Sequence, residues 1–506
     1  MTTSSREIED KYDVDEFFAL PELAGTGAVA SVGEPTEIRL EAMYFDTDDL
    51  RLATAGVTLR RRLGGADEGW HLKLATTPRI RTEVRRPPGR STRTVPIALR
   101  RLVRGISRDA PLAPVARLST VRTVRELRDA DGSVLAELCD DRVSAEELGS
   151  TATLSSWREL EVELIDGDLP LLKAVGPALL AAGARPATHP SKLARVLGGR
   201  LRARRPVEPS DPDSAGAVIW RSLGRHVDAL RGHEPLVRQD EPDSVHQMRV
   251  AVRTLRSLLA AYRPLFDHAV TEPIRAELKW LGGVLGPARD AEVMGDRLHE
   301  RALEQSPDLL LGPVLSRIDS VQRGTYRDAR AAVVEELNGA RYVELLDSLD
   351  DLLRHPPFTA LAARPARKVL PSRVGKAWRR LDAAVATAHA PGLAGPEQAV
   401  ALHQARKAAK RVRYAAVATG SAGGSDAATF AKRIKKVQSA LGDHQDSVLS
   451  RELLRTLGVQ AHLAGENGFT YGLLYAAEER RAAGDRRLFD RIWSKASRKR
   501  QLRWLG

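Results

Sequence analysis

The chain has 506 residues, of which 42% are hydrophobic, and carries 79 Lys and Arg against 66 Asp and Glu. This length predicts two or three domains, each with its own core, and the composition excludes a mostly disordered chain. The single cysteine, Cys139, excludes an intramolecular disulfide framework and a thiolate zinc site, and agrees with a reducing compartment. No apolar run approaches the roughly 20 residues of a spanning helix, so we expect a cytoplasmic protein without a membrane partner.

The positive charge is divided unevenly along the chain. Residues 1–205 hold 32 basic and 30 acidic residues, whereas residues 206–506 hold 47 and 36, a net charge of +11. The second half therefore predicts an acidic partner, for which nucleic acid, an anionic membrane and a phosphate polymer all qualify.

The first half contains short segments of alternating polarity that are separated by Gly and Pro. This pattern is typical of antiparallel strands. The segments are Arg6–Val14, Val57–Leu63, Gly69–Leu74, Arg81–Arg85, Val134–Cys139 and Arg158–Ile165.

The polar faces of these strands carry both signs of charge. Glu7, Glu9 and Lys11 share one face of an extended segment, and the glutamates of Glu159-Leu-Glu-Val-Glu163 share another. Basic side chains share faces at Arg60 and Arg62, at His71 and Lys73, and at Arg81 and Arg85 with Glu83. If the sheet closes into a barrel with its apolar side outward, the lumen holds carboxylates close to guanidinium groups. Such a lumen suits a metal-bound oligophosphate, with Mg²⁺ or Mn²⁺ on the carboxylates and phosphate on Arg and Lys.

The order of these motifs resembles the CYTH domain, or triphosphate tunnel fold, over about residues 4–200. The motifs are Glu7-x-Glu9-x-Lys11, Tyr44-Phe-Asp-Thr47, Leu59-Arg60-Arg-Arg62, Trp70-His-Leu-Lys73, the Glu159/Glu161/Glu163 strand and Ser191-Lys192. The resemblance implies an α+β fold for residues 1–201, an antiparallel tunnel-like β-barrel with flanking helices.

The resemblance also implies roles for individual residues. The implied metal ligands are Glu7, Glu9, Glu159, Glu161, Glu163 and either Asp140 or Asp141, of which alternation from Glu137 favours Asp141. The implied phosphate ligands in the tunnel are Lys11, Arg60, Arg62, Lys73, Arg81, Arg122 and Lys192. Catalysis would fall to Glu159, Glu161 and Lys11, with Mg²⁺ or Mn²⁺ activating water for hydrolysis of a terminal phosphate. His71 departs from the small hydroxyl residue that many relatives carry at its position.

Residues 202–214 contain three prolines among charged residues and predict an interdomain linker. Beyond them, apolar residues recur at three- and four-residue spacings, which predicts an all-α domain over residues 215–506. A weaker break near His355-Pro-Pro predicts two helical repeats at about 215–354 and 370–500.

Each predicted repeat carries a basic stripe at the same spacing. At about 100° per residue, offsets of 3, 7 and 10 from a histidine fall within one arc of a helix. The stripes are His246, Arg249, Arg253 and Arg256 in the first repeat, and His403, Arg406, Lys410 and Arg413, with Lys407 beside them, in the second. A second match follows each stripe. In the first repeat, Lys279 is followed by Leu285-Gly286 and Asp290. In the second repeat, Lys435 is followed by Leu441-Gly442 and Asp446 at the same spacings.

The charge of the stripes is almost entirely of one sign. A solvated helix face usually interleaves acids, because like charges three and four residues apart repel by a few tenths of a kcal/mol per pair. Both stripes lack such acids, so we expect an anion to neutralise them.

The repeated His-x-x-Arg-x-x-x-Arg stripe in two Ala-rich halves resembles the CHAD domain, the conserved histidine α-helical domain, over about residues 214–500. The resemblance implies two pseudo-symmetric helical bundles that bind inorganic polyphosphate. The implied ligands are His246, Arg249, Arg253, Arg256, Lys279, His403, Arg406, Lys407, Lys410, Arg413 and Lys435.

Two functions remain open at this point. The first is a divalent-metal-dependent hydrolase that removes phosphate from tripolyphosphate or polyphosphate held by the helical domain. The second is a non-catalytic polyphosphate-binding protein that tethers to granules. Nucleic acid is a less favoured partner, since base stacking needs aromatic residues and only Tyr414 adjoins either stripe.

Overall fold

The structure is a computed structural model that describes residues 3–75, 80–89, 93–149, 153–202, 208–393 and 395–505. The chain divides into two compact units, Met1–Arg205 and Pro206–Gly506. The bounds of the linker at 202–214 and of the helical repeats stay predictions, and residues 203–207 of that linker lie outside the described residues.

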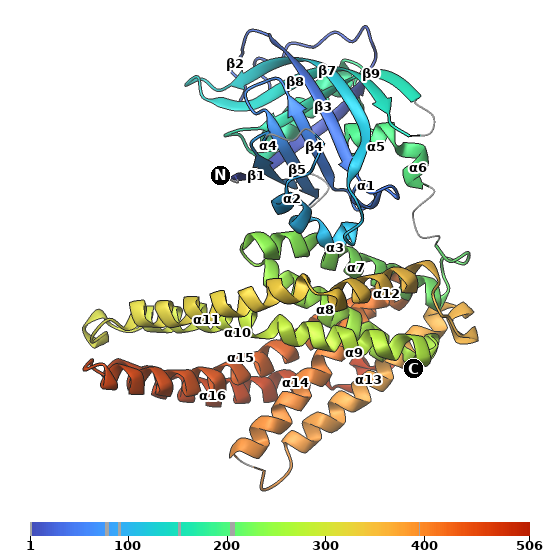
Figure 1. The fold of residues 1–506 in the computed structure, drawn as a ribbon. Coiled ribbons are helices and arrows are strands. Elements are labelled where there is room, and N and C mark those ends of the chain that lie inside the picture. Colours follow the sequence, from blue (N-terminus) through green and yellow to red (C-terminus); the bar gives the residue numbers. More distant parts are fainter. Residues whose placement is uncertain are drawn as a thin grey trace. The chain divides into compact units, whose positions relative to one another are not determined.

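The first unit contains an antiparallel sheet of ten strands (Figure 1). The sheet order is β10-β1-β6-β5-β4-β3-β7-β8-β9, and β2 pairs with β7. The strands are β1 Thr3–Val14, β2 Ser31–Val32, β3 Thr36–Asp46, β4 Thr58–Leu63, β5 Gly69–Ala75, β6 Ile80–Arg86, β7 Ala113–Arg128, β8 Val134–Glu147, β9 Thr153–Leu164 and β10 Arg185–Pro186.

Strand β1 has a double role in the curvature of the sheet. Its residues 3–8 pair with β6 and its residues 9–14 pair with β9. No described residue of β1 pairs with both strands. The sheet therefore curves around a lumen, but backbone hydrogen bonds do not join its described strands into a complete ring at any height along the lumen. The expected barrel is wrong in this respect, while the antiparallel sheet with helices is confirmed.

Helices cover the apolar side of the sheet and one end of the lumen. The helices of this unit are α1 Arg51–Thr54, α2 Ile97–Leu102, α3 Arg104–Ser107, α4 Leu169–Ala181, α5 Lys192–Val196 and α6 Gly198–Arg202. Helix α4 begins after Asp168, whose carboxylate accepts the Leu171 N–H at 3.1 Å, and its leucines pack on Leu160 and Val162. Helix α5 packs through Leu193 against Ala42 and Leu118, which lie on the lumen side.

The second unit is all-helical, which confirms the predicted fold class. Its α-helices are α7 Ala215–Gln239, α8 Ser244–Ala261, α9 His268–Val284, α10 Gly286–Leu303, α11 Val314–Leu337, α12 Ala340–Arg354, α13 Ala366–Ala388, α14 Gly395–Ala418, α15 Gly424–Leu463 and α16 Phe469–Ala496. Short 3-10 turns η5 Lys499–Gln501 and η6 Arg503–Leu505 follow α16. The apolar faces of α7–α9 and α12–α15 share one core.

Two long hairpins extend from this core. Helices α10 and α11 form one hairpin and α15 and α16 the other, and they lie side by side (Figure 1) around a second apolar cluster that includes Leu298 and Leu454. In the second hairpin, α15 is a single helix of 40 residues. The matching part of the first repeat is divided into α9 and α10 by a break at Leu285. Pro287 follows this break, and its missing N–H explains why the helix does not continue unbroken.

Candidate functional site

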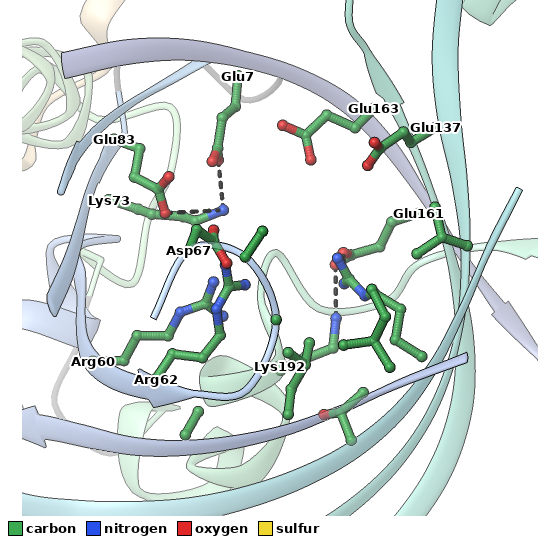
Figure 2. A pocket seen from close by; sticks show the side chains of 18 of the residues that line it. Glu7, Arg60, Arg62, Asp67, Lys73, Glu83, Glu137, Glu161, Glu163 and Lys192 are labelled. Carbon is green, nitrogen blue, oxygen red and sulfur yellow. Dashed lines mark hydrogen bonds and ion pairs between the residues drawn. The ribbon is translucent and has the colours of Figure 1, made fainter. Parts of the chain in front are cut away.

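The sheet of the first unit encloses a cavity of about 600 Å³ lined by charged side chains of both signs. Figure 2 shows Arg60, Arg62 and Lys73 gathered on one side of this cavity and Glu161 and Glu163 on the other. The period-two alternation explains the lining, because the alternate residues of these strands are apolar and face the other way.

Three buried carboxylates form a compact cluster on β8 and β9. One oxygen each from Asp141, Glu159 and Glu161 lies within 4.8 Å of the other two. Strand pairing produces this cluster, since Asp141 stands opposite Glu159 in the ladder and Glu161 lies two residues further along the same face. Oxygen atoms at this density form a donor set that suits a hard divalent cation.

Cations from three elements surround the acidic cluster. Lys192 of α5 lies 2.9 Å from Asp141, 2.8 Å from Glu159 and 2.8 Å from Glu161. Arg122 of β7 donates twice to Asp141, at 2.7 Å each, and once to Glu161. Burial alone would raise the pKa of Glu161, but these cations together with Lys11 hold that pKa well below its usual range.

The two neighbouring aspartates of β8 face opposite sides of the sheet. Asp141 is fully buried in the cluster. Asp140 forms a bidentate pair with Arg158, at 2.9 and 2.7 Å, on the other side of the sheet. Asp141, which the alternation from Glu137 favours, is thus the aspartate on the face of β8 that carries the acidic cluster.

The acidic residues of β1 reach the same cavity but lie outside this cluster. Glu7 accepts from Lys73 at 2.5 Å, and Glu9 pairs with Lys11 at 2.9 Å. Lys11 also hydrogen-bonds Glu161. Burial, reinforced by the charge of Glu7, raises the pKa of Glu163 to about 7.

The cationic side of the cavity is built by β4 and β5. Arg60 donates to the Tyr44 hydroxyl at 3.2 Å, and Arg62 pairs with Asp67. Burial, followed by the charges of Arg60 and Arg122, lowers the pKa of Arg62 to about 9. Positive charge is thus concentrated and partly desolvated here, so an anionic ligand would be bound strongly.

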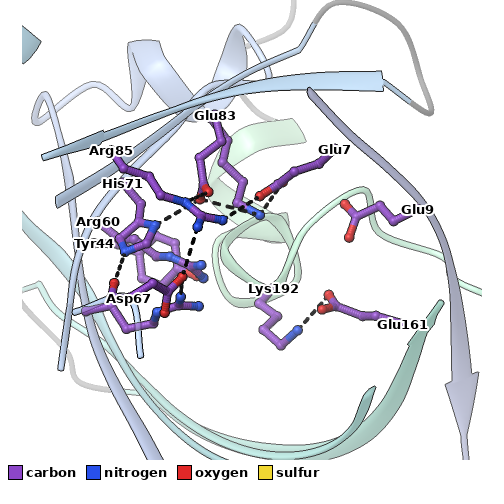
Figure 3. Close-up of polar contacts among 12 residues, drawn as sticks. Glu7, Glu9, Tyr44, Arg60, Asp67, His71, Glu83, Arg85, Glu161 and Lys192 are labelled. Atoms are coloured by element: carbon purple, nitrogen blue, oxygen red, sulfur yellow. Dashed lines mark hydrogen bonds and ion pairs between the residues drawn. The ribbon is translucent and has the colours of Figure 1, made fainter. Parts of the chain in front are cut away.

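A buried histidine joins this cationic side to β6 (Figure 3). The His71 ring faces Glu83 through Nδ1 at 2.9 Å and the Asp67 carbonyl through Nε2 at 2.8 Å. Glu83 also hydrogen-bonds Arg85 and lies 3.7 Å from Lys73. Both neighbours of the ring accept hydrogen bonds, but burial lowers the pKa of His71 to about 4. At neutral pH the uncharged ring therefore donates to only one of them.

In the helical unit, α8 and α14 pack against each other and bring the two basic stripes together. Arg253 of α8 donates to the hydroxyl of Tyr414 on α14 at 2.9 Å. The same ring carries Arg413, whose guanidinium carbon is 4.7 Å from the ring centroid. Tyr414 is itself buried, so it positions arginines and offers no exposed stacking surface.

The matched residues after each stripe make matched contacts. Arg249 donates to the Gly286 carbonyl at 3.1 Å and to Asp290 at 2.7 Å. Arg406 lies 3.7 Å from Asp446, and a Cβ on Gly442 would stand 3.4 Å from its Nη2. Gly442 therefore leaves room for Arg406, whereas a Cβ on Gly286 would stand at an ordinary contact distance of 3.9 Å from Nη2 of Arg249.

Lys410 lies where the stripes of α8 and α14 meet. Burial and then the positive charges of Arg406, Arg253 and Arg249 lower its pKa to about 7. Burial likewise lowers the pKa of His246 and that of His403. In the described part of this unit, Nδ1 of His403 and Nε of Arg406 are buried without a hydrogen-bond partner.

Comparison with known proteins assigns both units. Residues 5–184 match the CYTH domain family and residues 221–455 match the CHAD domain family. The chain joins a CYTH domain to a CHAD domain. It is 41% identical over 488 residues to an uncharacterized protein found in two strains of Mycobacterium tuberculosis, covering 93% of this chain and 92% of that protein.

Solved structures similar to each domain are more distant. The CHAD domain from the plant Ricinus communis is 23% identical, with a TM-score of 0.44, over 57% of this chain and 97% of that chain. A putative adenylyl cyclase from Hippeastrum, described as having a dominant triphosphatase activity, is 19% identical, with a TM-score of 0.24, over 38% of this chain and 96% of that chain.

The CYTH cavity brings most of its predicted residues together. Its buried Asp/Glu cluster could bind a divalent metal, and the predicted cations that surround the cavity are Lys11, Arg60, Arg62, Lys73, Arg122 and Lys192. The side chain of Arg81, in β6, lies outside the described residues, although its backbone pairs with Glu7. Glu7, Glu9 and Glu163 are near the cluster without belonging to it.

In the CHAD domain, the predicted residues differ in exposure. Partly buried members are His246, Arg249, Arg253, His403, Arg406, Lys410 and Arg413, and exposed members are Arg256, Lys279, Lys407 and Lys435. No described helix is long and apolar enough to cross a membrane.

Sequence reasoning gave no site role to five acidic residues that line the CYTH cavity, namely Glu34, Asp67, Glu83, Glu126 and Glu137. Glu83 and Asp67 hold its cations, and Glu137 stands opposite Glu163 across the β8–β9 ladder. Glu83 and Arg85 are two residues apart in β6, and this alternation indicated that their side chains lie on the same face of the strand. Asp67 lies in the turn between β4 and β5, where no periodic pattern could place it.

Proposed function

We propose that this protein binds inorganic polyphosphate through its CHAD domain and hydrolyses tripolyphosphate or polyphosphate in its CYTH cavity with Mg²⁺ or Mn²⁺. The observation that carries the proposal is the cavity of about 600 Å³, which has desolvated cations on one side and, on the other, Glu161 of the three-carboxylate cluster. A charged chain of phosphates needs both a cation on its oxygens and positive groups around it.

The donor chemistry of the acidic cluster fits the metal. Asp141, Glu159 and Glu161 offer only carboxylate oxygens, the ligands that Mg²⁺ and Mn²⁺ prefer. Bound there, the metal would supply Lewis-acid stabilisation of phosphate oxygens. Glu163 and the β1 glutamates would bind close by, in agreement with the ligand set that the CYTH resemblance implies.

The chain's own cations would hold the substrate. Arg60 and Arg62 can each bind phosphate oxygens through two N–H groups, and Lys73 adds a point charge. Their fixed positions favour the negative charge that develops on the leaving oxygen, because the donors need no reorganisation during the reaction. Water attacks the terminal phosphorus as the bridging P–O bond breaks, so a covalent nucleophile is not required.

The CHAD domain supplies the means of retaining a long polymer. Two basic stripes meet at the α8–α14 contact, where burial and then the charges of Arg406, Arg253 and Arg249 lower the pKa of Lys410. Phosphate polymer fits better than nucleic acid, because Tyr414 is buried under arginines and is not available to stack on a base.

Phosphate release tests the hydrolase. The full-length protein is incubated with tripolyphosphate and Mg²⁺ or Mn²⁺ beside the double variant Glu159→Gln/Glu161→Gln. A matched control, Glu37→Gln/Glu146→Gln, removes two carboxylates that do not line the cavity. We expect release from the wild type and the control and none from the cavity variant. Equal rates in all three would leave the non-catalytic, granule-tethering function instead.

Competition tests the ligand of the CHAD domain. Long-chain polyphosphate should displace RNA and DNA from the cavity variant, and its binding should fall steeply with salt. If nucleic acid displaces polyphosphate, the choice of ligand is wrong.

A further inference from the structure

Two segments outside the stripes are strongly basic. Residues 364–380 hold seven Arg or Lys and no acid, and residues 486–503 hold eight with a single acid, Asp490. Asp490 is already paired with His389, at 2.7 Å from its Nε2. Both segments therefore carry a large uncompensated charge.

Tertiary packing joins these distant segments in one place. Trp378 of α13 stacks on Trp493 of α16 with ring centroids 5.0 Å apart. Turn η6 packs against α13 at Gly375, where a Cβ would stand 3.0 Å from the Leu505 carbonyl and 3.8 Å from Nη1 of Arg379. The C-terminal turns are thus held beside the Arg379 guanidinium.

The cations at this junction form a surface that we name the C-terminal basic face. It consists of Lys376, Arg379 and Arg380 of α13 with Lys499, Arg500 and Arg503 of the C-terminal turns, and all six are exposed. Among residues 208–393 and 395–505, none of the six has a carboxylate within salt-bridge distance. Arg341, an exposed arginine of the same domain, is by contrast paired with Glu277 at 2.6 Å.

The face is continuous with the stripes through one further arginine. Arg411 belongs to α14, which packs against both α13 and α8. Burial, followed by the charge of Arg380, lowers the pKa of Arg411. Burial, followed by the charge of Arg411, lowers the pKa of the stripe residue Arg256. The charge of Arg411 therefore links Arg380 of the C-terminal basic face to the first stripe.

We propose that the C-terminal basic face is a second binding site for phosphate polymer, which long chains reach from the stripes and short chains do not. This inference rests on the proposed binding of polyphosphate by the stripes. A phosphate polymer is favoured over nucleic acid, because Trp378 is buried, Trp493 and Trp504 are partly buried, and these rings already pack against one another or against Phe430.

The test compares chain lengths in the full-length protein. The variant Arg379→Gln/Arg380→Gln/Arg503→Gln removes three charges from the face. Its control, Arg323→Gln/Arg327→Gln/Arg455→Gln, removes three exposed charges from α11 and α15. Binding of tripolyphosphate and of long-chain polyphosphate is measured by titration at several salt concentrations.

We expect the face variant to lose roughly 10-fold in affinity for the long chain, with a salt slope that falls by about 2, since each lost contact on a single-stranded polyanion lowers it by about 0.7. Affinity for tripolyphosphate should stay unchanged, and the control should bind both ligands normally. Equal losses for both chain lengths, or no loss for the long chain, would overturn the inference. Loss of RNA binding alone would overturn it as well.

A stripe variant separates this inference from the function on which it rests. Arg253→Gln/Lys410→Gln should weaken binding of the long chain, whereas tripolyphosphate can still enter the CYTH cavity. If the stripe variant leaves long-chain binding intact, the proposed role of the stripes fails. If only the face variant then loses affinity for long-chain polyphosphate, the face binds the polymer without the stripes. That result would contradict the inference that long chains reach the face from the stripes.

Discussion

Replacing Lys410 by glutamine should stabilise the ligand-free protein while it weakens polyphosphate binding. The ammonium group is buried close to Arg406 on its own helix and to Arg253 and Arg249 on α8, with Asp446 of α15 as the opposing charge. Its pKa falls from 10.5 to about 7, a difference of about 3.5. At about 1.36 kcal/mol for each pKa unit, the ceiling is about 4.8 kcal/mol. Solvent screening of the exposed part reduces the expected effect to about 2 kcal/mol.

The pH dependence follows from the direction of this shift. Below pH 7 the lysine is protonated in both the folded and the unfolded chain, so the folded state bears the whole cost of the buried charge. Between about pH 7 and 10.5 the unfolded chain binds more protons, so the free energy of unfolding rises with pH. Lys410→Gln should therefore exceed the wild type in stability by about 2 kcal/mol at pH 6, and the difference should shrink towards pH 10.

Urea unfolding of the full-length protein, followed by helix ellipticity at pH 6 and pH 9, measures this difference. Lys432→Gln, an exposed position on α15, is the matched control and should not change the pH dependence. Polyphosphate binding near pH 8 should take up a proton in the wild type and none in Lys410→Gln, because the anion favours the ammonium form. A Lys410→Gln protein no more stable than the wild type at pH 6 would refute this account of the stripes.

Three further substitutions test other parts of the structure. Asp141→Asn should lower the affinity for Mn²⁺ by at least roughly 10-fold, the cost of losing a supporting partner of a metal site. Asp140→Asn should keep the affinity for Mn²⁺ but lose about 2 kcal/mol of stability, because its pair with Arg158 is lost. Equal Mn²⁺ titration curves for the two variants would contradict the assignment. Glu478→Ala removes the buried carboxylate that Arg297 and Arg301 of α10 share, and leaves Arg301 its pair with Glu304. Thermal unfolding should show a loss of about 2 kcal/mol, and a loss below about 0.5 kcal/mol would contradict this. Tyr414→Phe keeps the ring under Arg413 but removes the hydroxyl that accepts a hydrogen bond from Arg253. The variant should lose about 1 kcal/mol of stability and bind polyphosphate more weakly. Unchanged polyphosphate titrations would show that the hydroxyl does not position Arg253.

The local sequence determined which side chains share a face. A period of two fixed Glu7, Glu9 and Lys11 on one side of β1, and it favoured Asp141 over Asp140. In the helices, offsets of 3, 7 and 10 aligned each basic stripe. These relations depend on backbone geometry within one element, so they can be read without knowing the neighbours of that element.

What lies across from each face was decided by the tertiary structure. Strand register placed Asp141 opposite Glu159, and the packing of α8 on α14 brought Arg253 within reach of Tyr414 and lowered the pKa of Lys410. The double pairing of β1 also decided that the sheet surrounds its cavity without closing at one level. Pairing and packing depend on the whole chain, and local pattern carries little information about them.

The basic character of the second half shows the same division. Its net charge and its two stripes are properties of the sequence alone. The C-terminal basic face exists only because aromatic packing holds the end of the chain against α13, so that two distant basic segments repel each other at one surface. Sequence thus set how much positive charge the domain carries, and the fold decided where that charge is concentrated, since electrostatic repulsion depends on distance in space.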